Sequence, residues 1–150
     1  MRIWIDADGC PVVNLTIGIA KKYQMPVSVV KNYAIVIEND YAEIITVDIS
    51  RDAADYYIAN HIEPGDLVIT QDNGLAAMVL AKKGRCLNQN GRVIDEANID
   101  FVLDSRHHGR VARLQHQRGP RHKKRTNEDD VQYEKALKEM IDKDRRSHVY

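Results

Sequence analysis

Cysteine, aromatic residues and long apolar runs are all scarce in this chain of 150 residues. Its two cysteines, Cys10 and Cys86, stand far apart, which excludes a disulfide framework and gives no zinc-knuckle spacing. No stretch approaches the ~18 consecutive apolar residues of a membrane span, and the first residues contain no apolar core of a secretory signal. We therefore expect a cytoplasmic protein that does not enter a membrane.

What the chain does have is the composition of an ordinary globular protein, with 43% hydrophobic and 29% charged residues. Its length is enough to bury roughly two thirds of the unfolded surface in one core. We find no internal repeat and no low-complexity segment. We therefore expect a single domain over 1–150, with an α/β core at 1–105, a basic segment at 106–125 and a C-terminal helix at 127–146.

Short Val/Ile-rich runs alternate with segments of helical periodicity through the first part of the chain. Turn-forming Pro, Gly, Asn and Asp bound the runs, as is typical of buried strands. Such alternation predicts a mostly parallel sheet between two layers of helices, which is a three-layer α/β fold. Residues 33–37 fit either an additional strand or a long connection. The expected strands lie near 2–6, 27–31, 44–48, 67–71 and 85–88, and the expected helices over about 11–23, 52–61 and 74–83.

A further helix is predicted at 127–146, where Asn127 can act as the N-terminal cap. Acidic residues fill its first turn and basic residues its last, which matches the helix dipole at both ends. One apolar stripe runs along it, so we expect this helix to dock on the core. The stripe consists of Tyr133, Leu137, Met140 and Ile141.

Carboxylates follow two of the predicted strands. Asp6 and Asp8 come at the end of the first strand, and Asp72 follows the apolar run at 67–69 in the same setting. In α/β sheets, ligands bind outside the carboxyl ends of the strands. Carboxylates gathered there repel one another unless a cation lies between them, so the pattern favours a divalent metal with oxygen ligands.

Two of these acids also have a simpler structural explanation. Asp8 can cap the helix that follows the first strand, and Asp72 can cap the helix that follows the 67–71 strand. We favour a functional role for Asp72, since capping and metal ligation compete for one side chain. For Asp8 the two interpretations are equally balanced.

Three other aspartates are candidates of unequal strength. Asp52 and Asp55 open the 52–61 helix, where both favour its N-terminus electrostatically. Asp55 is the better functional candidate because Asp52 suffices as a cap. Asp66 follows Pro64-Gly65 and is expected to form a structural turn before a strand.

Zero net charge conceals a basic strip. Residues 1–105 carry 9 basic and 15 acidic side chains, whereas residues 106–125 carry 8 basic and none acidic. Such a block beside an acidic site favours binding of a nucleic-acid backbone, although a solvated loop that pairs with the acidic remainder is the alternative. The strip has no interleaved aromatic residues, so it gives no sign of base stacking. The expected contacts are Arg106, Arg110, Arg113, Arg118, Lys123 and Lys124.

Ordered motifs recur through most of the chain, at 6–12, 52–55, 65–72, 75–76, 98–99 and 119–120. Together they resemble the YaiI/YqxD family of uncharacterised bacterial proteins, which is itself similar to PIN-like nuclease domains. The resemblance implies a PIN-like fold in which acids at strand ends hold Mg²⁺ or Mn²⁺. Transferred to this sequence, it points to Asp6, Asp8, Asp55 and Asp72 as metal ligands and catalytic residues, with Thr70-x-Asp72 as the strand-end motif.

The leading interpretation is therefore a metal-dependent nuclease that acts on RNA. Asp6-x-Asp8-Gly9 is also similar to the first motif of haloacid-dehalogenase-type phosphatases, in which Asp6 would be the nucleophile. Against this, Gly65-Asp66 precedes a strand where that family places such a pair after one. A non-catalytic RNA-binding or adaptor protein is the third alternative. A thiolate nucleophile at Cys10 has no general base within sequence reach.

Overall fold

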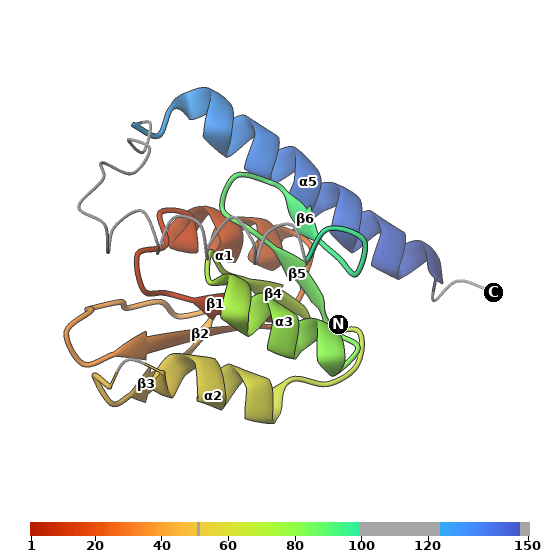
Figure 1. Cartoon of the computed structure of the whole chain (residues 1–150). Coiled ribbons are helices and arrows are strands. Elements are labelled where there is room, and N and C mark those ends of the chain that lie inside the picture. Colours follow the sequence, from red (N-terminus) through yellow and green to blue (C-terminus); the bar gives the residue numbers. More distant parts are fainter. Residues whose placement is uncertain (51, 100–123, 148–150) are drawn as a thin grey trace.

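The computed structural model describes residues 1–50, 52–99 and 124–147. They form a six-stranded sheet with the order β3-β2-β1-β4-β5-β6, with α1 and α5 on one face and α2 and α3 on the other (Figure 1). The three-layer α/β prediction is thus confirmed. The elements are β1 (Ile3–Asp6), α1 (Val13–Lys22), β2 (Val27–Asn32), β3 (Glu43–Val47), α2 (Ala53–His61), β4 (Leu67–Ile69), α3 (Asn73–Ala81), β5 (Arg85–Leu87), β6 (Val93–Ile94) and α5 (Asn127–Ser147).

Every strand and helix expected from the sequence is present, with ends within two residues of the prediction. Residues 33–37, which the sequence left open, form part of a connection without a strand. One element was not expected: β6, a two-residue strand antiparallel to β5. The helix α1 starts at Val13, because Pro11 lies in the preceding turn.

All strand pairs except β5–β6 are parallel. The central strand β1 pairs with β2 on one side and β4 on the other, so Ile3 lies opposite both Val27 and Leu67. The chain moves outward from β1 to β3 and then returns to β4 on the opposite side. The strand order therefore reverses between β1 and β4, and in α/β sheets the crevice at such a reversal is the usual ligand site.

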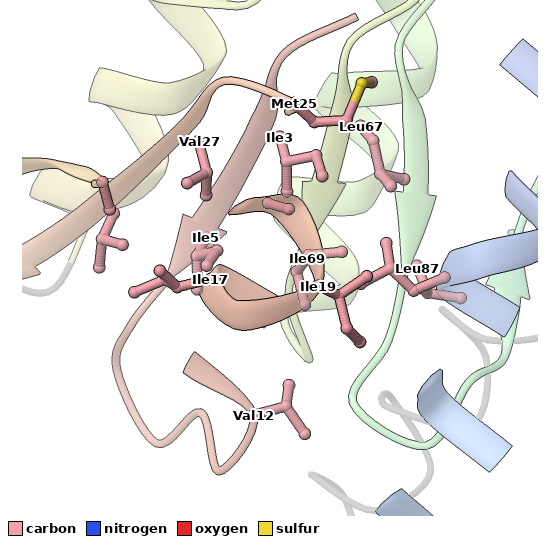
Figure 2. Close-up of a cluster of buried hydrophobic side chains, with 14 of the residues drawn as sticks. Ile3, Ile5, Val12, Ile17, Ile19, Met25, Val27, Leu67, Ile69 and Leu87 are labelled. Carbon is pink, nitrogen blue, oxygen red and sulfur yellow. The ribbon is translucent and has the colours of Figure 1, made fainter. Parts of the chain in front are cut away.

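Two apolar layers enclose the sheet. Alternate residues of the central strands, such as Ile5 and Trp4, point to opposite faces and enter different clusters. Figure 2 shows the cluster beneath α1, where Ile5 and Ile69 lie beside Ile17 and Ile19. The other cluster packs against α2 and α3. Central strands covered on both faces explain why their sequences read as continuous apolar runs.

The helix α5 docks on α1 as predicted, with all four residues of its apolar stripe buried. The Tyr133 hydroxyl donates to the Thr16 hydroxyl at 2.6 Å, and the Thr16 hydroxyl donates to the Val12 carbonyl. Burial of each such large apolar side chain contributes about 1.5–3 kcal/mol. Within the described ranges, no helix is long and apolar enough to cross a membrane.

The cap of α5 differs from the prediction by one residue. Thr126, and not Asn127, stands before the helix: its hydroxyl accepts from the Asp129 backbone N–H at 3.3 Å, and Asp129 accepts from the Thr126 N–H at 2.9 Å. This reciprocal arrangement is a capping box. Its signal was present in the sequence as a Thr three residues before an acid.

Candidate active site

Asp6 ends β1 at the point where the strand order reverses. It is 7% exposed, and its Oδ2 atom accepts a hydrogen bond from the Thr70 hydroxyl at 2.9 Å. Thr70 follows β4, so this bond joins the ends of the two strands that flank the reversal. Thr70 belongs to the Thr70-x-Asp72 motif singled out in the sequence, and in the structure its hydroxyl orients the neighbouring acid.

Burial raises the pKa of Asp6 to about 6. The hydrogen bond from Thr70 and one from the Asp8 backbone lower the pKa, whereas the nearby carboxylates of Asp72 and Asp8 raise it further. No ion pair joins Asp6 to a cationic side chain in the part of the chain that the structure describes. Among these residues, Asp6 therefore has hydrogen-bond donors but no cationic side chain in an ion pair.

Asp72 both caps α3 and approaches the other acids. Its Oδ1 atom accepts from the backbone N–H groups of Gly74 at 2.8 Å and Leu75 at 3.2 Å. Its own N–H donates to the Thr70 hydroxyl at 2.9 Å. From the sequence, capping and metal ligation were alternatives for this side chain. The cap is present and fixes the carboxylate beside Asp6 and Asp55, and metal ligation by Asp72 stays a prediction.

Asp55 reaches the same place from the first turn of α2. Burial raises its pKa to about 7, and the charges of Asp72 and Asp6 together with a hydrogen bond to the Asp72 side chain add to the rise. A hydrogen bond between two carboxyl groups needs a shared proton. The raised pKa of Asp55 lets this side chain hold that proton up to about neutral pH.

The structure shows neither the helix cap expected at Asp52 nor the one that was an open alternative for Asp8. Asp52 stands at the N-cap position of α2 but its side chain makes no capping hydrogen bond; its charge instead contributes to the raised pKa of Asp55. Asp8 does not cap α1, because Val12 occupies the N-cap position. Asp8 is exposed in the β1–α1 turn, at the rim of the site.

Three of the four predicted ligands, Asp6, Asp55 and Asp72, thus lie together, with Asp8 beside Asp6. Their oxygens suit a hard cation such as Mg²⁺ or Mn²⁺. Within residues 1–50, 52–99 and 124–147, however, no three Asp, Glu, His or Cys side chains are arranged to hold a metal ion. The donor chemistry fits such an ion, and the arrangement of the acids is not that of a formed metal site.

Asp66 lies at the opposite edge of the sheet, before β4, and is also 7% exposed. It accepts three hydrogen bonds, from the backbone N–H groups of Arg2 and Glu63 at 3.0 Å and from the Trp4 indole at 3.1 Å. The structural role expected for Asp66 therefore agrees with the structure. The Gly65-Asp66 pair lies at the far edge from Asp6, which gives the phosphatase interpretation no support.

Of the six predicted nucleic-acid contacts, only Lys124 is described, and it is exposed. Arg106, Arg110, Arg113, Arg118 and Lys123 lie outside the described residues. The adjacent Arg125 has a structural role: it forms an ion pair with Asp130 at 2.7 Å and donates to the Gln89 carbonyl at 2.9 Å. Its contact with the turn after β5 brings the end of the basic strip to the carboxyl edge of the sheet.

Cys10 lies near this edge and is half-buried. Burial raises the pKa of its thiol, which is the reverse of what an activated thiolate requires. The pKa of the buried Cys86 rises to about 12 for the same reason. Neither cysteine has the properties of a nucleophile.

Comparison with known proteins gives one family and no solved structure. Residues 4–143 match a family model described as "Uncharacterized BCR, YaiI/YqxD family". A UPF0178 protein of Alkaliphilus oremlandii is 49% identical over 95% of this chain and 92% of its own length. Those of Exiguobacterium sibiricum and Natranaerobius thermophilus are 45% and 41% identical, each over 94% of this chain and 96% of their own length.

No solved structure matches the chain, so the similarity to PIN-like domains stays a prediction. The family model and the relatives each span nearly the whole chain, including the segments that carry Asp6, Asp55 and Asp72. The chain therefore belongs to the YaiI/YqxD family.

Proposed function

We propose that this protein is a divalent-metal-dependent nuclease that hydrolyses phosphodiester bonds in RNA. The observation that carries the proposal is the group of three acids at the strand-order reversal, two of which have pKa values raised to about 6 and 7. Buried acids with raised pKa values are common at functional sites, because their unfavourable environment is retained for chemistry. A cation bound between the three carboxyl groups would remove the repulsion between their negative charges.

Asp6, Asp55 and Asp72 would hold Mg²⁺ or Mn²⁺ in this proposal. When bound, such an ion stabilises charge on the phosphate and makes a water molecule more acidic. The protein supplies the geometry: Thr70 fixes Asp6, and the cap of α3 fixes Asp72. Asp8, exposed at the rim, would help to position the attacking water molecule.

RNA is proposed as the substrate because of the basic strip. Eight basic side chains without an intervening acid supply the charge that a polyphosphate backbone requires. The strip ends at Arg125, which contacts the turn after β5 at the same edge of the sheet as the acids. Acids for chemistry and bases for binding would then serve one substrate.

The test is cleavage of a labelled RNA by the purified protein with Mn²⁺. Asp72→Asn is the informative variant, since asparagine also caps helices well and α3 should keep its start. We expect this variant to bind RNA but to cleave it more slowly by a factor of about 10 to 100 or more. Loss of a residue that only supports a metal ligand already lowers metal affinity or activity by about that factor. Asp142→Asn, which removes an exposed acid on α5, is the matched control and should cleave normally.

A second variant separates binding from chemistry. Replacing Arg110, Arg113, Lys123 and Lys124 by glutamine should weaken RNA binding and flatten its dependence on salt, with cleavage retained at saturating RNA. Binding without cleavage of any substrate in a broad panel would contradict the nuclease. Attachment of beryllofluoride to Asp6 would then indicate a phosphatase, and its absence a binding protein.

A further inference from the structure

The two edges of the sheet differ in how they are protected against pairing with another chain. The edge strand β6 has two residues and is followed by the exposed acids Asp95 and Glu96. The other edge strand, β3, has five residues, Glu43-Ile-Ile-Thr-Val47, without proline or lysine. Its single charge, Glu43, stands at its start and pairs with Arg2 at 3.6 Å. Edge strands usually carry prolines, inward charges or lysines that prevent pairing, and β3 has none of these.

The composition of β3 is that of an interior strand. Ile44 packs against the cluster beneath α1, whereas Ile45 and Val47 pack against the cluster of α2 and α3. All three are only half-buried, although their neighbours in β2, Val29 and Val30, are completely buried. Apolar residues on both faces are typical of a strand with a neighbour on each side. Among the described residues, however, β3 pairs only with β2.

We propose that β3 pairs antiparallel with β3 of a second copy of this chain about a two-fold axis, which joins the two six-stranded sheets into one. The backbone of an edge strand is a row of alternating donors and acceptors, so a strand is the partner that satisfies it. Both faces of β3 would then gain apolar neighbours. Ile49, two residues beyond the strand and 66% exposed, extends the apolar surface at this edge.

In this arrangement the side chains of β3 in one copy are compatible with those that lie opposite them in the second copy. In the antiparallel register that pairs all five residues, Ile45 lies opposite Ile45 of the second copy, and Glu43 lies opposite Val47. No two like charges meet, whereas like charges opposite one another would destabilise the pair. Pairing of β3 with β6 of another copy would use only two residues and would build an open filament, whereas β3 with β3 closes.

The pairing has a geometric consequence for the acids. A two-fold axis that relates antiparallel neighbours in one sheet stands perpendicular to the sheet. The carboxyl edges of the two copies therefore face opposite directions, and the two groups of acids stay separate. Dimerisation is independent of nuclease activity, and the measurement that tests it is the mass of the protein in solution.

Sedimentation of the full chain tests it, with the expected species at twice the 17.1 kDa mass of one chain. Ile45→Lys and Ile45→Glu each place like charges on the axis and should weaken the dimer at least about a hundredfold. An equimolar mixture of the two variants should restore it, because the lysine introduced in one copy then meets the glutamate introduced in the other. Such rescue requires that position 45 faces itself.

Two further variants keep the test decisive if the Ile45 variants fail to fold. Thr46→Lys changes an exposed side chain of β3 and should also give monomers. Val93→Lys makes the matched change on β6 and should leave the dimer intact. A wild-type chain that stays monomeric up to about 1 mM overturns the proposal. So does a dimer that survives the β3 changes or is lost with Val93→Lys.

Discussion

Asp6 and Asp66 are buried to the same extent, each 7% exposed, at opposite edges of one sheet. Asp66 accepts three N–H hydrogen bonds, from two backbone groups and the Trp4 indole. Asp6 accepts one from the Thr70 hydroxyl and one from the Asp8 backbone, and it faces the carboxylates of Asp72 and Asp8. Equal burial thus leaves the two carboxylates with different numbers of donors and different neighbouring charges.

The difference separates an acid that stabilises the fold from an acid that is a candidate for chemistry. Three donors compensate the loss of water around Asp66, so its carboxyl group holds the start of β4 to β1. At Asp6, burial prevails over the donors and the pKa rises to about 6. An acid maintained in such surroundings is a candidate for binding a cation or a proton.

The same substitution at both edges should give opposite results. Asp66→Asn puts an amide N–H₂ where N–H donors need acceptors, and it should lower the free energy of unfolding by about 2–5 kcal/mol. Asp6→Asn removes a repelled charge while an oxygen stays available to Thr70, so stability at about pH 8 should be unchanged or higher. Urea denaturation measures both, and equal losses at the two positions would refute the contrast.

Mn²⁺ binding should depend on pH because the ion competes with protons. Asp6 and Asp55, with pKa values of about 6 and 7, must lose their protons before they can act as ligands. Between about pH 8 and pH 5.5 the affinity should fall by up to about a hundredfold. Calorimetry measures this, with Asp142→Asn as the control that keeps the dependence. An affinity independent of pH would exclude these two acids as ligands.

Without metal, stability should fall as pH rises. The folded protein holds protons on Asp6 and Asp55 up to about pH 6 and 7, whereas the unfolded chain loses them near the ordinary aspartate pKa of 3.8. Their contribution to the free energy of unfolding is therefore largest at low pH and is lost between about pH 4 and 7. Denaturation in EDTA should show this slope, and Asp55→Asn should reduce it. A slope of the opposite sign would contradict the raised pKa values.

The smallest effect is expected at Thr70. Thr70→Val leaves Asp6 Oδ2 without its donor and the Asp72 N–H without its acceptor, at a cost of about 1 kcal/mol. The pKa of Asp6 should move up further, because the lost hydrogen bond lowers it. Carboxyl-carbon NMR titration measures this shift. Thr70→Ser retains the hydroxyl and should behave as wild type; a shift of equal size there would assign the effect to packing.

The sequence predicted the layers of this fold because the information for them is local. Runs such as 67–69 are buried on both faces of the sheet, and the periodicity of the apolar residues of α5 is visible without tertiary contacts. Even so, β6 was missed, because two residues are too few for a periodic signal. Asn90-Gly91 between β5 and β6 was the available hint, since Asn-Gly favours a tight hairpin turn.

The candidate site could be predicted only in part. The strand-end rule brings Asp6 and Asp72 together from strand order alone. The contact of Asp55 with Asp72 depends on how α2 is rotated over the sheet, which its weak apolar periodicity did not specify. The three donors of Asp66 were also beyond reach, because two of them are more than sixty residues away in the sequence.

The placement of α5 has a consequence for the order in which this protein is built. Residues 127–147 leave the ribosome after every other described residue, yet Tyr133, Leu137 and Ile141 are completely buried beside α1. Until α5 is synthesised, the apolar surface of α1 that these three side chains contact therefore lacks this cover. Folding of this face can finish only after α5 has been synthesised, and until then it is the part of the nascent chain that a chaperone would recognise.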